Sequence, residues 1–371
     1  MLNTDVAMRA EIGARLARAR VETGLTQAAL AERVNMERTQ LVRVEGGERK
    51  VTVRELAAIA NELGVPIDVF VADAPATVLS RRADPASGHE TSLALDREVE
   101  RAARDVRWLL ERRLLSVGST AGPELVPDSY GAAESLADQM RRRLEIGDEP
   151  LIDLGRAVEQ MGVVWFSLDL GDRTDGACVE VDVPDGRRVG VAVINGNAEP
   201  GRRRWTLAHE LGHFLTGDAY AAGHPAGNVE RFLDAFVAYF LMPRTGVERL
   251  WRDLEASGPD RVAMAIAAQY RTSWSAACNQ LSSLRLIERQ SLAGMVRRIP
   301  SRGDFLAAGE AWVEELAAPA APPTYSSEVL AAYASGELAA AKTLDLLRAT
   351  LTAGELPSRA IVEPVTALPE P

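Results

Sequence analysis

The chain has 371 residues, more than one ordinary domain needs and enough for two or three domains with separate hydrophobic cores. Hydrophobic residues make up 47% of it and charged residues 26%, and no apolar run approaches the roughly 20 residues that span a bilayer, so the composition excludes a membrane protein. The net charge of −11, concentrated towards residues 300–371, argues against indiscriminate binding to nucleic acid.

The first residues carry no signal for secretion. Asp5 and Glu11 interrupt the apolar residues where a signal would need a basic stretch followed by an apolar core, so we expect a cytoplasmic protein. Cys178 and Cys278 lie far apart, with no second cysteine or histidine at ligand spacing beside either. We expect both to be buried free thiols.

Residues 1–72 are predicted to form an all-α domain of short helices. One helix opens at Thr26, and the next runs from about Glu37 to Val44 after a short turn at Asn35. Two helices joined this tightly cannot lie antiparallel, and the second projects outwards, where it could enter a DNA major groove. A helical module that binds only protein is the alternative.

The segment from Gly24 to Glu32, with Leu56–Ala60 and Leu63–Val65, resembles the XRE-type helix-turn-helix family of phage-repressor-like proteins. The resemblance places Gln27 where family members meet a phosphate. It places the residues that read base edges on the second helix, at Arg38, Thr39, Gln40 and, one turn further, Arg43. Arginine can pair bidentately with guanine and glutamine with adenine, so the side chains suit this role.

The charges of this domain predict how it would bind DNA. Glu37 and Glu45 flank the second helix, and residues 1–72 carry as many acidic as basic side chains. We therefore expect modest affinity for each monomer and binding as a homodimer to a palindromic double-stranded operator.

Residues 73–127 are predicted to be a linker that carries one amphipathic helix. Segment 73–92 is poor in large apolar residues and holds Pro75, Pro85 and Gly88. Over 93–115 apolar residues recur at helical spacing, at Val99, Ala102, Val106, Leu109 and Leu114. We expect this helix to dock on its own domain, and a dimerisation helix is the alternative.

Residues 128–295 are predicted to form a second domain. Helices over 130–145 and 151–161 precede a strand at Val163–Phe166 and a hairpin around Pro184-Asp185-Gly186. Further helices follow, and 296–371 is an acidic helical C-terminal region. The predicted fold class is mainly α with a small antiparallel sheet (α+β).

The strongest chemical signal is His209-Glu210-Leu211-Gly212-His213. Histidines four apart on a helix lie on one face and can share a Zn²⁺ ion, with Glu210 beside the metal. A catalytic zinc takes three protein ligands and keeps one position open. We expect the third ligand to be Glu230, with Asp234 within reach of a ligating imidazole. This is a gluzincin-like arrangement.

Other ligand assignments stay open. Asp234 could bind the metal directly, and Asp218 is a weaker choice. His224 and Tyr220 have no assigned role. Tyr239 is nine residues beyond Glu230, two and a half turns, which places it on the opposite helical face and argues against a role as an oxyanion donor.

The segments Arg202–His213 and Ala235–Pro243 resemble the ImmA/IrrE family of metallopeptidase domains, over roughly residues 130–290. The resemblance implies cleavage of a partner repressor in response to a signal. The bound zinc would activate water, and Glu210 would be the catalytic base.

Two functions remain open for the whole chain. It could be a DNA-binding transcription regulator that acts as a zinc peptidase on a repressor or on its own linker near 73–92. Alternatively, it could be an antitoxin-like autorepressor with a toxin as its partner, whose zinc domain is a non-catalytic sensor or interaction module.

Overall fold

The computed structural model describes residues 2–65, 67–71, 77–83, 89–118, 124–171, 174–183, 186–217, 226–310 and 313–359. The chain divides into two compact units, Met1–Pro75 and Ala76–Pro371. Among the described residues, none of the helices combines the length and the apolar character that crossing a bilayer requires.

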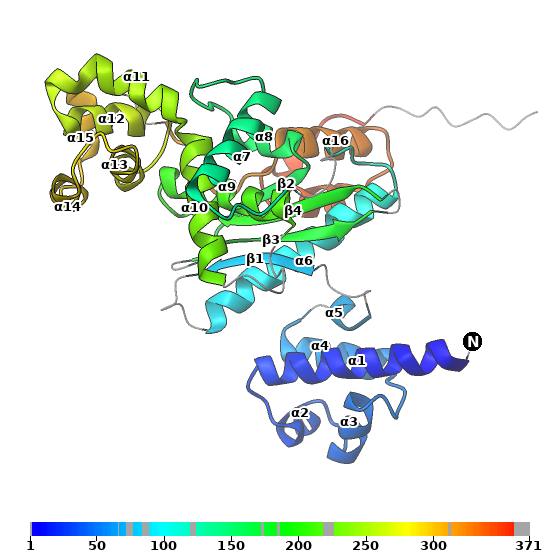
Figure 1. Ribbon diagram of the computed structural model, residues 1–371. Coiled ribbons are helices and arrows are strands. Elements are labelled where there is room, and N and C mark those ends of the chain that lie inside the picture. Colours follow the sequence, from blue (N-terminus) through cyan, green and yellow to red (C-terminus); the bar gives the residue numbers. More distant parts are fainter. Residues whose placement is uncertain are drawn as a thin grey trace, which may run out of the picture. The chain divides into compact units, whose positions relative to one another are not determined.

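The first unit is all-helical, as expected. Its helices are α1 (Leu2–Glu22), α2 (Gln27–Arg33), α3 (Arg38–Glu45), α4 (Val53–Leu63) and α5 (Asp68–Val71) (Figure 1). Thr26 caps α2 by accepting a hydrogen bond from the Ala29 amide, and Asn35 adopts a left-handed φ of 54° between α2 and α3. The core that fixes the helix pair is built from fully buried side chains, among them Leu16, Leu30, Leu41, Ile59 and Phe70.

Two adjacent glycines after α3 differ in what they tolerate. Gly47 has a φ of +72°, and a Cβ there would lie 2.6 Å from the Ala10 Cα, whereas Gly46 has a helical φ of −80° and its nearest neighbour would be 3.4 Å away. We expect Gly47→Ala to destabilise this unit by at least about 1–2 kcal/mol from the left-handed backbone alone. Thermal unfolding should show the loss, and Gly46→Ala should leave the transition in place; equal melting of the two variants would contradict this account.

The second unit contains a four-stranded sheet. Its strands are β1 (Thr77–Ala83), β2 (Val163–Leu168), β3 (Thr174–Asp182) and β4 (Arg188–Asn195), in the order β1-β3-β4-β2. The predicted hairpin is present as the antiparallel β3–β4 pair, with Gly186 at a φ of +76°.

The small sheet is confirmed, but the prediction that it is antiparallel throughout was wrong. β2 does not pair with β3, which follows it in the chain; it pairs in parallel with β4, from Val163↔Gly190 to Leu168↔Asn195. Its nearly continuous burial is typical of a parallel strand covered on both faces. Moreover, β1 lies inside the predicted 73–92 linker, because pairing with β3 orders this segment although it holds few large apolar residues.

One face of the sheet is covered by α6 (His89–Glu111), α16 (Pro323–Ala334) and α17 (Ala340–Leu346). The apolar stripe of α6, including Val99 and Val106, is buried against sheet residues such as Val179 and Val191. The amphipathic helix therefore docks on its own unit, as expected, and its apolar face is not available for dimerisation.

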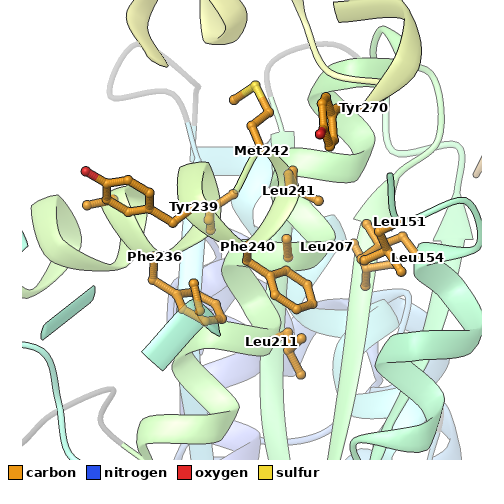
Figure 2. Close-up of a cluster of buried hydrophobic side chains, with 14 of the residues drawn as sticks. Leu151, Leu154, Leu207, Leu211, Phe236, Tyr239, Phe240, Leu241, Met242 and Tyr270 are labelled. Atoms are coloured by element: carbon orange, nitrogen blue, oxygen red, sulfur yellow. The ribbon is translucent and has the colours of Figure 1, made fainter. Parts of the chain in front are cut away.

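On the other face, α8 (Leu154–Gln160) and α9 (Pro200–Thr216) pack against the strands. α10 (Ala226–Leu241) packs against α9, and α7 (Tyr130–Arg143) packs against α10. In the close-up, Leu207 and Leu211 of α9 lie next to Phe236 and Phe240 of α10 (Figure 2). Cys178 and Cys278 are buried free thiols, as expected.

The remaining helices of the second unit pack mainly against other helices and not against the strands. They are α11 (Arg244–Leu254), η1 (Glu255–Ser257), α12 (Pro259–Gln269), α13 (Trp274–Ser283), α14 (Arg289–Arg297), α15 (Arg302–Ala307) and η2 (Ala353–Glu355). Glu315, which precedes α16 in the chain, forms an ion pair of 2.7 Å with the buried Arg204 of α9. The acidic C-terminal region is therefore joined to the helix that carries the histidine pair.

Candidate metal centre and DNA-binding surface

Helix α9 is a core helix that lies between the sheet and α10. Pro200 occupies its first turn, and Gly217 ends it with a left-handed φ of 64°. Gly212 allows α10 to approach closely, because a Cβ there would lie 3.2 Å from the Phe236 ring. This packing buries Glu210 completely and leaves His209 and His213 only 1% and 4% exposed.

The two histidines and Glu230 of α10 converge on one point. The His209 and His213 Nε2 atoms are 3.1 Å apart, and the Glu230 carboxylate oxygens lie 3.1 Å from His209 Nε2 and 3.4 Å from His213 Nε2. One ligand atom from each residue fits within 4.8 Å of the others. Two imidazole nitrogens and a carboxylate oxygen directed at a common point are a donor set that suits a metal ion.

Asp234 lies on the other side of the His209 ring. Its Oδ1 atom is 3.3 Å from His209 Nδ1 and accepts a hydrogen bond of 3.3 Å from Trp205 Nε1. A carboxylate here holds the imidazole with Nε2 directed at the converging point. Trp205 was missed by the sequence analysis, although its position one turn before His209 on the same helix was a usable signal.

The remaining sequence candidates do not join this cluster in the described part of the chain. Asp218, Tyr220 and His224 lie outside the described residues. The Tyr239 ring lies 5.8 Å from the Arg244 guanidinium, and burial raises the pKa of its hydroxyl.

The electrostatics of the cluster favour an ionised carboxylate. The hydrogen bond with His209, aided by the nearby His213, lowers the pKa of Glu230 although partial burial opposes this shift. The arrangement therefore presents a charged oxygen and two ring nitrogens together at neutral pH.

In the first unit, the residues expected to read bases lie on α3. Arg38, Thr39 and Arg43 are exposed and Gln40 is half-buried. Arg43 is 3.6 Å from the exposed Glu48, a pairing that solvent screens.

Gln27 and Glu45 are joined by contacts between helices that also involve Arg20. Gln27 Nε2 donates to Glu45 Oε2 over 2.8 Å, and Arg20 contacts both Glu45 oxygens at 2.6 and 3.1 Å. The charge of Glu45 is therefore neutralised at the C-terminal end of α3, and Glu45 does not act as a free negative charge beside the helix. The Gln27 amide is turned towards this carboxylate, a contact between helices that the sequence did not reveal.

Two parts of the chain match family models. Residues 11–70 match a helix-turn-helix domain, and residues 158–282 match an IrrE N-terminal-like domain of the peptidase M78 class. Both matches agree with the resemblances drawn from the sequence. No curated protein is similar enough to match.

Two solved structures align over most of the chain with little sequence or spatial agreement. PlcR of Bacillus thuringiensis, in complex with the peptide PapR7 and DNA, is 12% identical over 91% of each chain with a TM-score of 0.18. The apo form of the competence regulator ComR from Streptococcus vestibularis is 13% identical over 82% of this chain and 100% of that chain, with a TM-score of 0.17.

Proposed function

We propose that this chain, which joins a helix-turn-helix domain to an IrrE N-terminal-like domain, is a DNA-binding transcription regulator with a zinc metallopeptidase centre in its second unit. The observation that carries the proposal is the convergence of His209, His213 and Glu230 on one point. The M78 match over 158–282 supports the same chemistry independently.

In this proposal, His209, His213 and Glu230 hold the zinc ion and Asp234 orients His209. Zinc, when bound, supplies Lewis-acid chemistry to water and to the scissile carbonyl. Glu210 takes a proton from the attacking water and returns it to the departing amine nitrogen, so that water adds across the amide bond. The substrate is a peptide bond in a repressor or in this chain's own interdomain segment.

A second candidate is an antitoxin-like autorepressor whose metal site only stabilises the fold. The observation that favours it is the complete burial of the Glu210 side chain. A general base has to contact the attacking water, and a fully buried carboxylate has no contact with solvent. In both candidates the chain binds an operator as a homodimer and holds one zinc ion.

We expect the wild-type chain to bind one zinc ion and the His213→Ala variant to lose it. The variant retains only two of the three protein ligands that a catalytic zinc site needs. Elemental analysis of the purified full-length chain measures this directly. His89→Ala is the control, because His89 lies outside the cluster in sequence. Stoichiometric zinc in His213→Ala would show that the ligands are wrongly assigned.

Asp234→Asn should weaken zinc binding about 10–100-fold, because the orienting carboxylate is lost while the ligands remain. Glu230→Gln should weaken it further, because it removes the charge of a direct ligand. Competition with a chelator gives both affinities. If Asp234→Asn loses more zinc than Glu230→Gln, Asp234 is the third ligand and the roles of the two acids are exchanged.

A further inference from the structure

The segment that follows the first unit forms the outermost strand of the sheet in the second. β1 pairs antiparallel with β3, with Val78 opposite Val179 and Ser80 opposite Cys178 (Figure 1). β3 pairs with β4 on its other side, so β1 covers the edge that β3 would otherwise leave open. An open edge presents unpaired amide and carbonyl groups to any extended peptide.

The covered edge lies beside the helix that carries the metal ligands. A Cβ on Gly176 of β3 would lie 2.8 Å from Thr206 of α9, and Cys178 packs in the same core cluster as Leu207 and Leu211. Glu210 is also close enough to add to the effect of burial, which raises the pKa of the Cys178 thiol. Ser80 is therefore paired with Cys178, a β3 residue that lies close to Glu210.

The pairing of β1 is less regular than that of its neighbour. The β1–β3 register shifts twice, between Val78 and Ser80 and between Arg82 and Ala83. The β3–β4 register runs without a break from Gly176↔Ile194 to Asp182↔Arg188. Each irregularity interrupts the ladder of hydrogen bonds, so β1 is the easier of the two neighbours to remove from β3.

We propose that the edge of β3 is the binding edge for an extended protein segment at the metal centre, and that residues 77–83 are its resident occupant. A partner segment must displace β1 to pair with β3. The proposal rests on the proposed function, because it takes the metal centre as the place where a partner peptide binds. It makes the first strand of the second unit a competitive inhibitor built into the chain.

The strength of the competition follows from the tether. A short linked strand has an effective concentration on the order of millimolar. A free peptide with a dissociation constant of about 0.1 mM would then bind roughly tenfold more weakly to the intact chain than to a chain with an open edge.

Two full-length variants separate the occupied and open states. The double variant Ser80→Pro/Arg81→Pro is designed to release β1 from β3. Successive amide groups of β1 point alternately towards β3 and away from it. One of the two adjacent prolines therefore removes an amide that donates a hydrogen bond to β3. Ser80→Cys locks β1, since directly opposed residues have Cβ atoms close enough for a disulfide with Cys178. Ser80→Ala/Arg81→Ala is the control that keeps both amides.

The probe is a fluorescent peptide with the sequence of residues 76–84, and its binding is followed by anisotropy in chains that also carry Glu210→Gln, which prevents cleavage. The released chain should bind the peptide about tenfold more tightly than the alanine control, and the oxidised Ser80→Cys chain should not bind it until it is reduced. Hydrogen exchange of the β3 amides should rise only in the released chain.

The outcomes also separate this proposal from the proposed function. Failure of Ser80→Cys to crosslink to Cys178, or equal peptide binding by the locked and released chains, would overturn the assignment of the edge. If a chain with native Glu210 cleaves a partner equally well when locked and when released, the peptidase stands and the edge proposal falls. Peptide binding by the released chain without any cleavage keeps the edge and removes the peptidase.

Discussion

Replacing Glu210 with glutamine is expected to lower peptide-bond cleavage by about 10²–10⁴-fold, the usual contribution of a general base, while the zinc content stays unchanged. Glu210 is not among the residues whose ligand atoms converge, so the three proposed zinc ligands stay in place in the variant. Glutamine has the same shape as glutamate, which preserves packing at this fully buried position. Under inducing conditions, wild type should give a discrete fragment of its substrate or of itself, and the variant should not.

Glu199→Gln provides the matched control. Glu199 is an exposed residue at the start of the same helix, and its side chain makes no capping hydrogen bond. Equal amounts of fragment from wild type and Glu210→Gln would contradict the catalytic role. Identical repression by both proteins, with no fragment from either, would favour the antitoxin-like regulator.

The parts of the site that could be predicted from sequence depend on local periodicity. His209 and His213 face the same point because they are one helical turn apart on α9, and Glu230 and Asp234 share a side of α10 for the same reason. The turn at Asn35 and the helices beside it were predictable as well, because turn and capping residues act over a few positions.

The parts that could not be predicted depend on contacts between distant segments. The apolar run within Val163–Leu168 suits a strand buried on both faces, but it does not identify β4 rather than β3 as the partner strand. Thr77–Ala83 becomes a strand through its pairing with β3, a distant segment of the chain. The Arg20–Glu45 ion pair and its hydrogen bond from Gln27 join α1, α2 and the end of α3. The sequence alone shows three polar side chains here, and it does not show that they contact one another.

We expect Arg38→Ala and Gln40→Ala each to cost about 1–3 kcal/mol of preference for the operator, which is roughly 5- to 150-fold in affinity. Both residues lie in the first turn of α3, and Arg38 is exposed there. A bidentate side chain discriminates among bases, so its loss should weaken binding to the specific site and leave nonspecific binding almost unchanged. Gel shifts at fixed salt, with a palindromic site near the chain's own promoter and a scrambled duplex, measure the ratio.

Arg33→Ala is the control for the loss of a positive charge, since Arg33 lies on α2 and pairs with Glu62 at 3.0 Å. This variant should weaken binding to the palindromic duplex and to the scrambled duplex by a similar small factor. The reason is that a charge that is not directed at base edges contributes only sequence-independent attraction. Zinc removal should leave operator binding by the 1–75 fragment intact, because His209, His213 and Glu230 all lie in the other unit. If the double variant Arg38→Ala/Gln40→Ala keeps its preference for the palindrome, α3 is not the helix that reads the bases.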